Sequence, residues 1–230
     1  MARKKIVFVI VEGPSDEEAL GVILSKLYNT STVYVHIMYF DVTTAIGNTP
    51  SNIINKVCAT IKQYAKDSHF VNSHFQEIIH IVDTDGAYIP NDLVIEDMTL
   101  SDHVYTIDNI RTPNKEGIIQ RNAQKSENLN KLYSTNQIWG LPYRVYYMSC
   151  NLDHILYDKL NSSDAEKEND SFQFAKKYRA DINGFLSFIS NSDFSVNTDY
   201  KASWIHIKEN SNSLKRYSNL GLCFTELKVD

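Results

Sequence analysis

The sequence predicts an α/β fold in which a mainly parallel β-sheet is flanked by helices. The first observation is a series of short, near-continuously apolar runs rich in Val and Ile, typical of strands buried on both faces. The second is that segments of helical periodicity separate these runs, which favours parallel strands with helices packed on the sheet. The third is composition: 230 residues, 43% of them hydrophobic, suffice for one sizeable core.

The first half of the chain has the pattern β-α-β-α-β. Residues 4–11 (KKIVFVIV) are the first predicted strand, and residues 15–28 form a helix with apolar side chains at the spacing i, i+3, i+4, i+7. Ser15 and Glu18 fit an S-x-x-E capping box at the start of this helix. The remaining predicted elements are a strand over 32–42, a loop over 43–50, a helix over 51–68 and a strand over 75–82.

The second half is less regular. Residues 86–140 are predicted to be an insertion, with an extra strand over 103–112 and an exposed polar helix over 114–134. A fourth core strand over 143–149 and a helix over 150–160 follow, completing a domain over 1–160. The small, polar and charged residues 161–170 predict a linker. Residues 171–230 are predicted to be mainly helical, over 171–190 and again over 203–224, and whether they belong to the same domain is left open.

Composition narrows the classes of function. The net charge is −5, so no overall basic field indicates a nucleic-acid partner, although a local basic stripe is compatible with it. Cys58, Cys150 and Cys223 are widely spaced and form no CxxC pair, which disfavours a disulfide framework or a paired-cysteine zinc site. The apolar run over 4–11 is too short to span a membrane. The expectation is a cytoplasmic protein without membrane contact.

Acidic residues stand at the ends of two predicted strands. Glu12 follows the first strand, and Asp83 and Asp85 follow the third. Ligands of parallel sheets bind at the carboxyl ends of the strands, so these side chains are expected to meet; alternation places both aspartates on one side if extended geometry continues that far. Three adjacent carboxylates raise one another's pKa unless a cation neutralises them. Oxygen ligands suit Mg²⁺ or Mn²⁺, and phosphoryl chemistry is the natural use of such a site.

The segments VFVIVEGPSDEEAL and IIHIVDTDG resemble the two signature motifs of Toprim domains. In that Rossmannoid fold a glutamate follows the first strand and a D-x-D follows a later apolar strand. EGPSDEEAL is most similar to the E-G-x-S-D-E form of the OLD-like and RloB-like Toprim nucleases, many of which are linked to phage defence or abortive infection. In the RloB-like proteins an N-P-x-F-E-x-W motif follows the fourth strand; here SCNLDHIL stands at that place, with Asn151 and Asp153 but without the Pro, Phe and Trp.

The resemblance implies roles for five acidic residues. Glu12 matches the general acid/base or metal-linked glutamate, and Asp83 and Asp85 match the Mg²⁺ ligands. Asp16 matches an acidic residue that binds metal in the OLD-type arrangement, and Asp153 is a further candidate ligand. No other cofactor is implied.

Structural alternatives compete with these roles. Asp16 lies in the first turn of a predicted helix, where the helix dipole stabilises acids regardless of function. Asp85 and Gly86 form a common turn dipeptide, but two motifs in the correct order, each at a strand end, favour function. Four basic residues are candidate nucleic-acid contacts, with solvated surface as the alternative: Lys176, Lys177, Lys215 and Arg216.

The sequence therefore favours a hydrolase: a Mg²⁺- or Mn²⁺-dependent Toprim-like nuclease that cleaves phosphodiester bonds of DNA or RNA, with a role in phage defence. The rival hypothesis is a non-catalytic Toprim-like module that binds a nucleotide or a partner protein in a multi-protein defence system. An ATPase or another protein subunit, or a second copy of the chain, are the partners left open.

Overall fold

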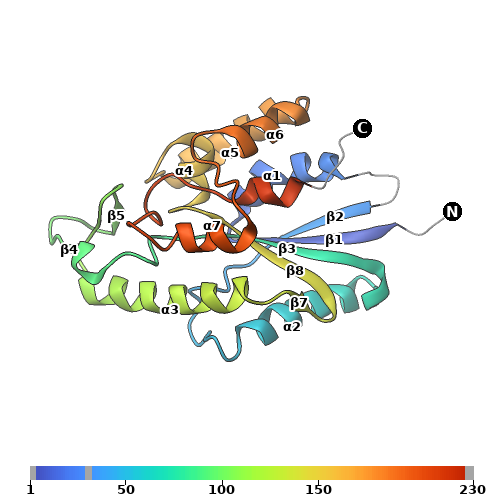
Figure 1. The fold of residues 1–230 in the computed structure, drawn as a ribbon, viewed down its shortest axis with the longest axis horizontal. Coiled ribbons are helices and arrows are strands. Elements are labelled where there is room, and N and C mark those ends of the chain that lie inside the picture. The colour runs from blue at the N-terminus through green and yellow to red at the C-terminus, as the bar shows by residue number, and fades with distance from the viewer. Residues whose placement is uncertain (1–3, 29–32, 226–230) are drawn as a thin grey trace.

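The computed structural model describes residues 4–28 and 33–225, and its central feature is a five-stranded sheet in the order β2-β1-β3-β8-β7 (Figure 1). Four strands are parallel, and the short β7 pairs antiparallel with β8. The strands are β1 (Lys5–Val11), β2 (Val33–Tyr39), β3 (Phe75–Asp83), β7 (Gln137–Ile138) and β8 (Leu141–Met148). The predicted α/β class is confirmed, and the arrangement is compatible with a Rossmannoid fold.

Helices cover both faces of this sheet (Figure 1). α1, α5 and α6 pack on one face, and α2, α3 and α7 pack on the other. β1 contributes side chains to the hydrophobic cores on both faces of the sheet. Val7, Val9 and Val11 pack in the core on the side of α1, and the alternate residues Ile6, Phe8 and Ile10 pack in the core on the side of α2. The α-helices are α1 (Pro14–Leu27), α2 (Ile53–Asp67), α3 (Lys115–Tyr133), α4 (Leu152–Tyr157), α5 (Asp164–Tyr178), α6 (Ile182–Asn191) and α7 (Tyr200–His206).

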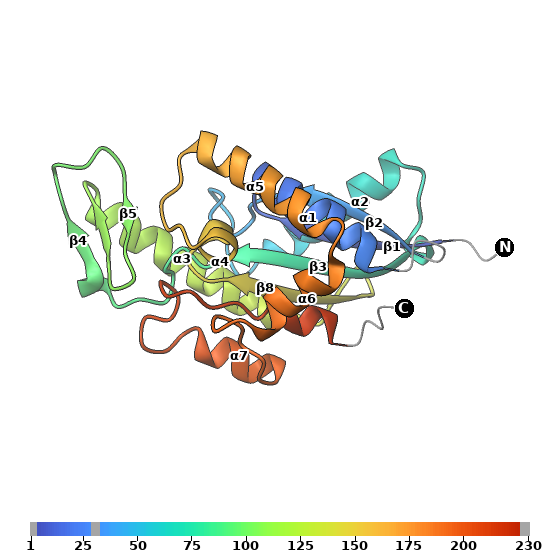
Figure 2. The same cartoon turned by 90° about the horizontal axis from the view of Figure 1, so that it is seen from above.

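The segment 86–140 contains a second, three-stranded sheet and the helix α3. The small sheet has the order β4-β6-β5 and lies beyond the carboxyl end of the main sheet (Figure 2). Its strands are β4 (Val94–Glu96), β5 (Val104–Tyr105) and β6 (Ile110–Thr112), of which the last two fall within the strand predicted over 103–112. The prediction that the helix over 114–134 is exposed is wrong, because one face of α3 lies against the core; its buried residues include Asn122, Lys125, Asn128, Leu129 and Leu132.

α1 begins two residues earlier than a capping box with Ser15 as N-cap predicts. Gly13 is the N-cap and Pro14 the first helical residue, a position at which proline is pre-organised and needs no hydrogen-bond donor. The backbone N–H of Gly13 donates to Asp16 Oδ2 at 2.9 Å. Asp16, rather than Glu18, therefore reaches back to the start of the helix, and the predicted Ser15–Glu18 box is wrong.

The predicted linker over 161–170 is mostly helix. Ser163 caps α5, accepting from the Glu166 N–H and donating its own N–H to the Glu166 carboxylate. The polar first turns face solvent, while Phe174 and Tyr178 further along pack into the same core as α1. Composition alone predicts a linker because the exposed first turns have no apolar periodicity, but the S-x-x-E pattern of Ser163 and Glu166 is a local signal of a helix start.

The C-terminal region is less continuously helical than predicted. The segment 171–190 is broken between α5 and α6, where Asp181 accepts a hydrogen bond from the Gly184 N–H at 2.8 Å and so caps α6. Within 203–224, α7 ends at His206, and after a non-helical stretch a 3₁₀-helix, η3 (Leu220–Phe224), follows. Two further 3₁₀-helices are η1 (Asn72–His74) and η2 (Asn91–Leu93).

Among residues 4–28 and 33–225, no helix is long and apolar enough to cross a membrane. Residue 32, predicted to open the second strand, lies outside the described residues, as do residues 1–3 of the predicted first domain and 226–230 of the predicted C-terminal region.

Candidate functional site

Acidic side chains gather at the carboxyl edge of the main sheet. Glu12 directly follows β1, Asp41 lies shortly after β2, and Asp83 ends β3. Because these three strands are adjacent and parallel, their carboxyl ends open onto one cavity of about 580 Å³. The side chains that line it come from this edge and from the starts of α1 and α5: Glu12, Gly13, Pro14, Ser15, Asp16, Glu18, Asp41, Asp83, Asp164, Lys167 and Glu168.

Glu12 is held by a lysine and a threonine. Its carboxylate accepts from Lys125 Nζ at 3.1 and 3.3 Å and from Thr43 Oγ1 at 3.3 Å. Burial nevertheless raises the pKa of Glu12 to about 8, and the charges of Asp41 and Asp85 add to the rise against the opposing charge of Lys125. Glu12 is thus a carboxyl group poised to exchange a proton near neutral pH.

Asp83 has the least compensation. No hydrogen bond or ion pair from the described residues reaches its carboxylate. Burial holds the pKa of Asp83 well above its ordinary value, and the charges of Glu12 and Asp16 raise it further. Such a group is stabilised either by a proton or by a cation supplied from outside the chain.

Asp85 points to a different set of partners. The extended backbone of β3 ends at Asp83, and Asp85 (φ 49°) and Gly86 (φ 69°) form a left-handed turn closed by the Ala87 N–H donating to the Thr84 carbonyl. The condition for placing both aspartates on one side of a strand is therefore not met. A Cβ on Gly86 would lie 2.7 Å from Leu214 Cδ2, which together with the positive φ explains the glycine.

Lys125 of α3 forms an ion pair with both Asp85 and Glu12. Its side chain is 1% exposed, and although burial disfavours the ammonium, these carboxylates hold the pKa of Lys125 well above its ordinary value. Burial alone would raise the pKa of Asp85, but the charges of Lys125 and Arg121 keep it below its ordinary value. Tyr105 Oη also donates to Asp85 Oδ1 at 3.2 Å, and Arg121 donates to the Asp85 carbonyl at 2.9 Å.

α3 also fixes the loop that carries Asp41. Asn128 Nδ2 donates to the Thr43 carbonyl at 2.9 Å, and Gln124 Nε2 donates to the Ala45 carbonyl at 3.1 Å. Burial acts against the charged form of Asp41, yet the charge of Lys125 and hydrogen bonds from Thr43 and Thr44 lower its pKa. The segment predicted to be an insertion therefore supplies the lysine that pairs with Glu12 and Asp85, and the side chains that hold the loop of Asp41.

Asp16 and Asp153 lie in the first turns of two different helices, α1 and α4. Both are buried, with 8% and 5% of their surface exposed. Burial raises the pKa of Asp16 to about 6 against the hydrogen bond from Gly13, and the charge of Asp153 adds to the rise. Burial likewise raises the pKa of Asp153, while the charge of Lys167 opposes it. Asp16 lines the cavity, whereas Asp153 is buried at the start of α4.

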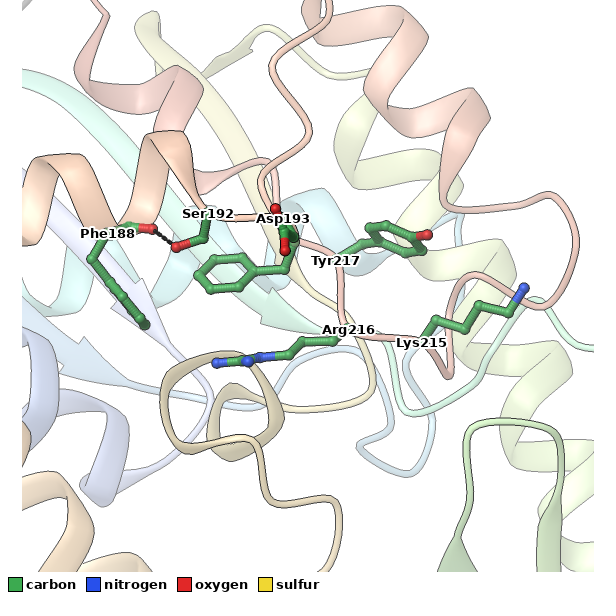
Figure 3. Close-up of a pocket in the computed structure, with 7 residues that line it drawn as sticks. Phe188, Ser192, Asp193, Lys215, Arg216 and Tyr217 are labelled. Carbon is green, nitrogen blue, oxygen red and sulfur yellow. Dashed lines mark hydrogen bonds between the residues drawn. The ribbon is translucent and has the colours of Figure 1, made fainter.

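The predicted nucleic-acid contacts lie away from this site. Lys176 and Lys177 are exposed near the end of α5, with Lys177 Nζ 4.6 Å from the ring centre of Tyr178. Lys215 and Arg216 line a second cavity of about 490 Å³ and point in opposite directions (Figure 3). Five other residues complete its lining: Phe188, Ser192, Asp193, Phe194 and Tyr217.

Arg216 has structural contacts that account for its position. It donates to the Ile155 carbonyl at 2.7 Å near the end of α4, and its guanidinium lies 4.8 Å from the ring centre of Phe194. It also pairs with Asp158 at 3.5 Å. The cavity in Figure 3 therefore lacks a cluster of acidic side chains such as the one that lines the cavity at the carboxyl edge of the main sheet.

The chemistry of the acidic cavity suits a hard divalent cation. Within residues 4–28 and 33–225, no three His, Cys, Asp or Glu side chains form a group that could hold a metal ion as they stand. Lys125 already lies between Glu12 and Asp85. The oxygen donors with raised pKa values are Glu12, Asp16 and Asp83, whose charged forms are disfavoured mainly by burial and which a cation would stabilise.

The sequence analysis missed Asp41 as a functional candidate, and it considered Lys125 only as a phosphate contact of the insertion, not as a buried partner of Glu12 and Asp85. Asp41 stands at the end of the second strand, so the strand-end rule that selected Glu12 and Asp83 could have selected it too. Lys125 gave only a weak signal, because a lysine on a polar helix is normally solvated. No protein-family model, curated protein or solved structure matches the chain.

Proposed function

We propose that this protein is a metal-dependent phosphodiesterase that hydrolyses DNA or RNA, with a Toprim-like catalytic site. The observation that carries the proposal is the shared cavity of Glu12 and Asp83, which follow adjacent parallel strands and both have raised pKa values. The order of the two acidic motifs, E-G-x-S-D-E and then D-x-D, supports the same assignment.

In this proposal Asp83, with Glu12 and Asp16, holds Mg²⁺ or Mn²⁺ at the cavity. The bound cation would supply charge stabilisation for the phosphoryl group. Glu12, with a pKa of about 8, is suited to accept or donate a proton near neutral pH. Lys125 keeps Asp85 ionised and holds it against α3, so that Asp85 serves to position Lys125 and the turn rather than to face the cavity.

Cleavage assays test this proposal directly. Labelled single-stranded DNA, double-stranded DNA and total tRNA are incubated with Mg²⁺, Mn²⁺ or EDTA. We expect metal-dependent cleavage by the wild type and its loss in Asp83→Asn and Glu12→Gln. Asp92→Asn, an exposed aspartate in η2, is the matched control and retains activity. Wild-type turnover by either site variant would refute the assignment.

One observation favours the rival, non-catalytic function. Lys125 pairs with both Glu12 and Asp85, so the chain itself balances part of the negative charge at this edge of the sheet. A folded wild-type protein that binds nucleotide or a partner subunit, yet cleaves none of these substrates with either metal, would support this function.

A further inference from the structure

Lys167 stands out because it is the lone basic residue among the side chains that line the acidic cavity. The lining includes seven carboxylates from four parts of the chain, against this single ammonium group: Glu12, Asp16, Glu18, Asp41, Asp83, Asp164 and Glu168. A phosphodiester entering this cavity carries negative charge into a strongly negative environment. It therefore needs a positive group there in addition to any metal.

The packing of α5 fixes the direction of Lys167. Ser171, one helical turn later on the same face, is fully buried and donates to Glu18 of α1 at 3.1 Å. Asp164 and Glu168 share this face and also line the cavity. α5 runs beside α1 (Figure 2), so Lys167 faces the first turn of α1 and the strand ends behind it.

The ammonium group of Lys167 is available for a ligand. In the described part of the chain it forms no ion pair with a carboxylate, and its side chain is half-buried. Its charge nevertheless acts on both Asp16 and Asp153, lowering the pKa of each. By contrast, Lys125 is fully engaged by two carboxylates and is 1% exposed.

We propose that Lys167 binds a non-bridging phosphate oxygen of the nucleic-acid backbone and presents that phosphate to Glu12 and Asp83. This inference rests on the proposed phosphodiesterase function. It assigns a contact with the substrate to α5, in the segment whose composition resembles a linker. It also distinguishes Lys167 from Lys176 and Lys177, which lie on α5 but do not line the cavity.

The test compares Lys167→Met and Lys167→Arg with Lys131→Met, an exposed lysine on α3. Binding of a fluorescein-labelled single-stranded oligonucleotide, as DNA and as RNA, is measured by anisotropy over a range of salt concentrations with Ca²⁺ present. KM and kcat for cleavage are measured with Mg²⁺. Loss of a charged hydrogen bond is expected to weaken binding and raise KM about tenfold in Lys167→Met, with recovery in Lys167→Arg.

The salt dependence separates substrate contact from a purely structural role. Removing one phosphate contact on a single strand lowers the slope of log K against log salt by about 0.7, which a folding defect would not do. If the wild type cleaves and Lys167→Met matches Lys131→Met in KM and slope, the inference fails while the proposed function stands. If the wild type binds without cleaving and Lys167→Met binds more weakly, the phosphate contact holds and the phosphodiesterase fails. A wild type that does neither overturns both.

Discussion

Replacing the buried Lys125 by methionine tests the electrostatic account of the site through stability alone. Methionine keeps most of the side-chain volume and removes the ammonium group. Lys125 Nζ lies 3.1 Å from Glu12 Oε2 and also pairs with Asp85, while the exposed fractions of these three side chains are 1%, 12% and 21%. The substitution therefore leaves two largely buried carboxylates without their cation.

The expected cost follows from the behaviour of broken buried ion pairs. Removing one partner of such a pair destabilises proteins by about 3–5 kcal/mol, because the remaining charge is buried without compensation. Glu12 adds little to this cost, because with a pKa of about 8 it is mostly protonated at pH 7. Asp85 has a lowered pKa in the native protein and depends more on Lys125, so it is expected to account for most of the loss.

Denaturant unfolding followed by circular dichroism at about pH 7 measures this loss, with Lys131→Met expected to change the free energy of unfolding by less than about 0.5 kcal/mol. The double variant Lys125→Met/Asp85→Asn is expected to be more stable than Lys125→Met alone, because it removes the stranded charge. A loss below about 1 kcal/mol in Lys125→Met, or no recovery in the double variant, would refute the reasoning.

Three other predictions concern pH, a turn and a helix cap. The pKa of Glu12 is raised on folding from 4.5 to about 8, so its contribution to stability is full below pH 4.5 and is lost as pH rises through 8. In pH profiles of urea unfolding, Glu12→Gln should therefore lose less stability than the wild type as the pH rises from 4.5 to 8. Gly86→Ala should lower the unfolding free energy by about 1–3 kcal/mol, because its φ is positive and the added Cβ meets Leu214; an unchanged denaturation midpoint would contradict this. Ser163→Ala should cost about 1 kcal/mol by removing the α5 cap, and equal thermal stability would show that the cap is dispensable.

The sheet and the strand-end acids were predictable because their signals are local. The apolar run before Asp83 can be read from a few consecutive residues, and parallel connection of such runs brings their carboxyl ends to one edge. That logic placed Glu12 and Asp83 at one edge of the sheet, and in the structure they stand at the ends of the adjacent strands β1 and β3. The same rule was not applied to the acid that follows the second strand, and Asp41 was missed for that reason although its signal is present in the sequence.

Other features were not predictable from local patterns. The start of α5 resembles a linker because its exposed turns have no apolar periodicity, although Ser163 and Glu166 form a capping box there. The burial of Lys125 depends on carboxylates 40 and 113 residues away in sequence, which no window along α3 contains. Likewise, Asp83 and Asp85 differ in direction because a left-handed turn intervenes, and that turn packs against Leu214.

By itself, the sequence determined the α/β class, the parallel strands and the acids that end two of them, since hydrophobic periodicity and strand connectivity act over short distances. Only the tertiary structure decided which charges compensate one another. It assigned Lys125 to Glu12 and Asp85, left Asp83 without a partner among the described residues, and brought Lys167 to the cavity. The physical reason is that burial and charge pairing depend on distances between elements remote in sequence, and the packing of α3 and α5 against the sheet sets those distances.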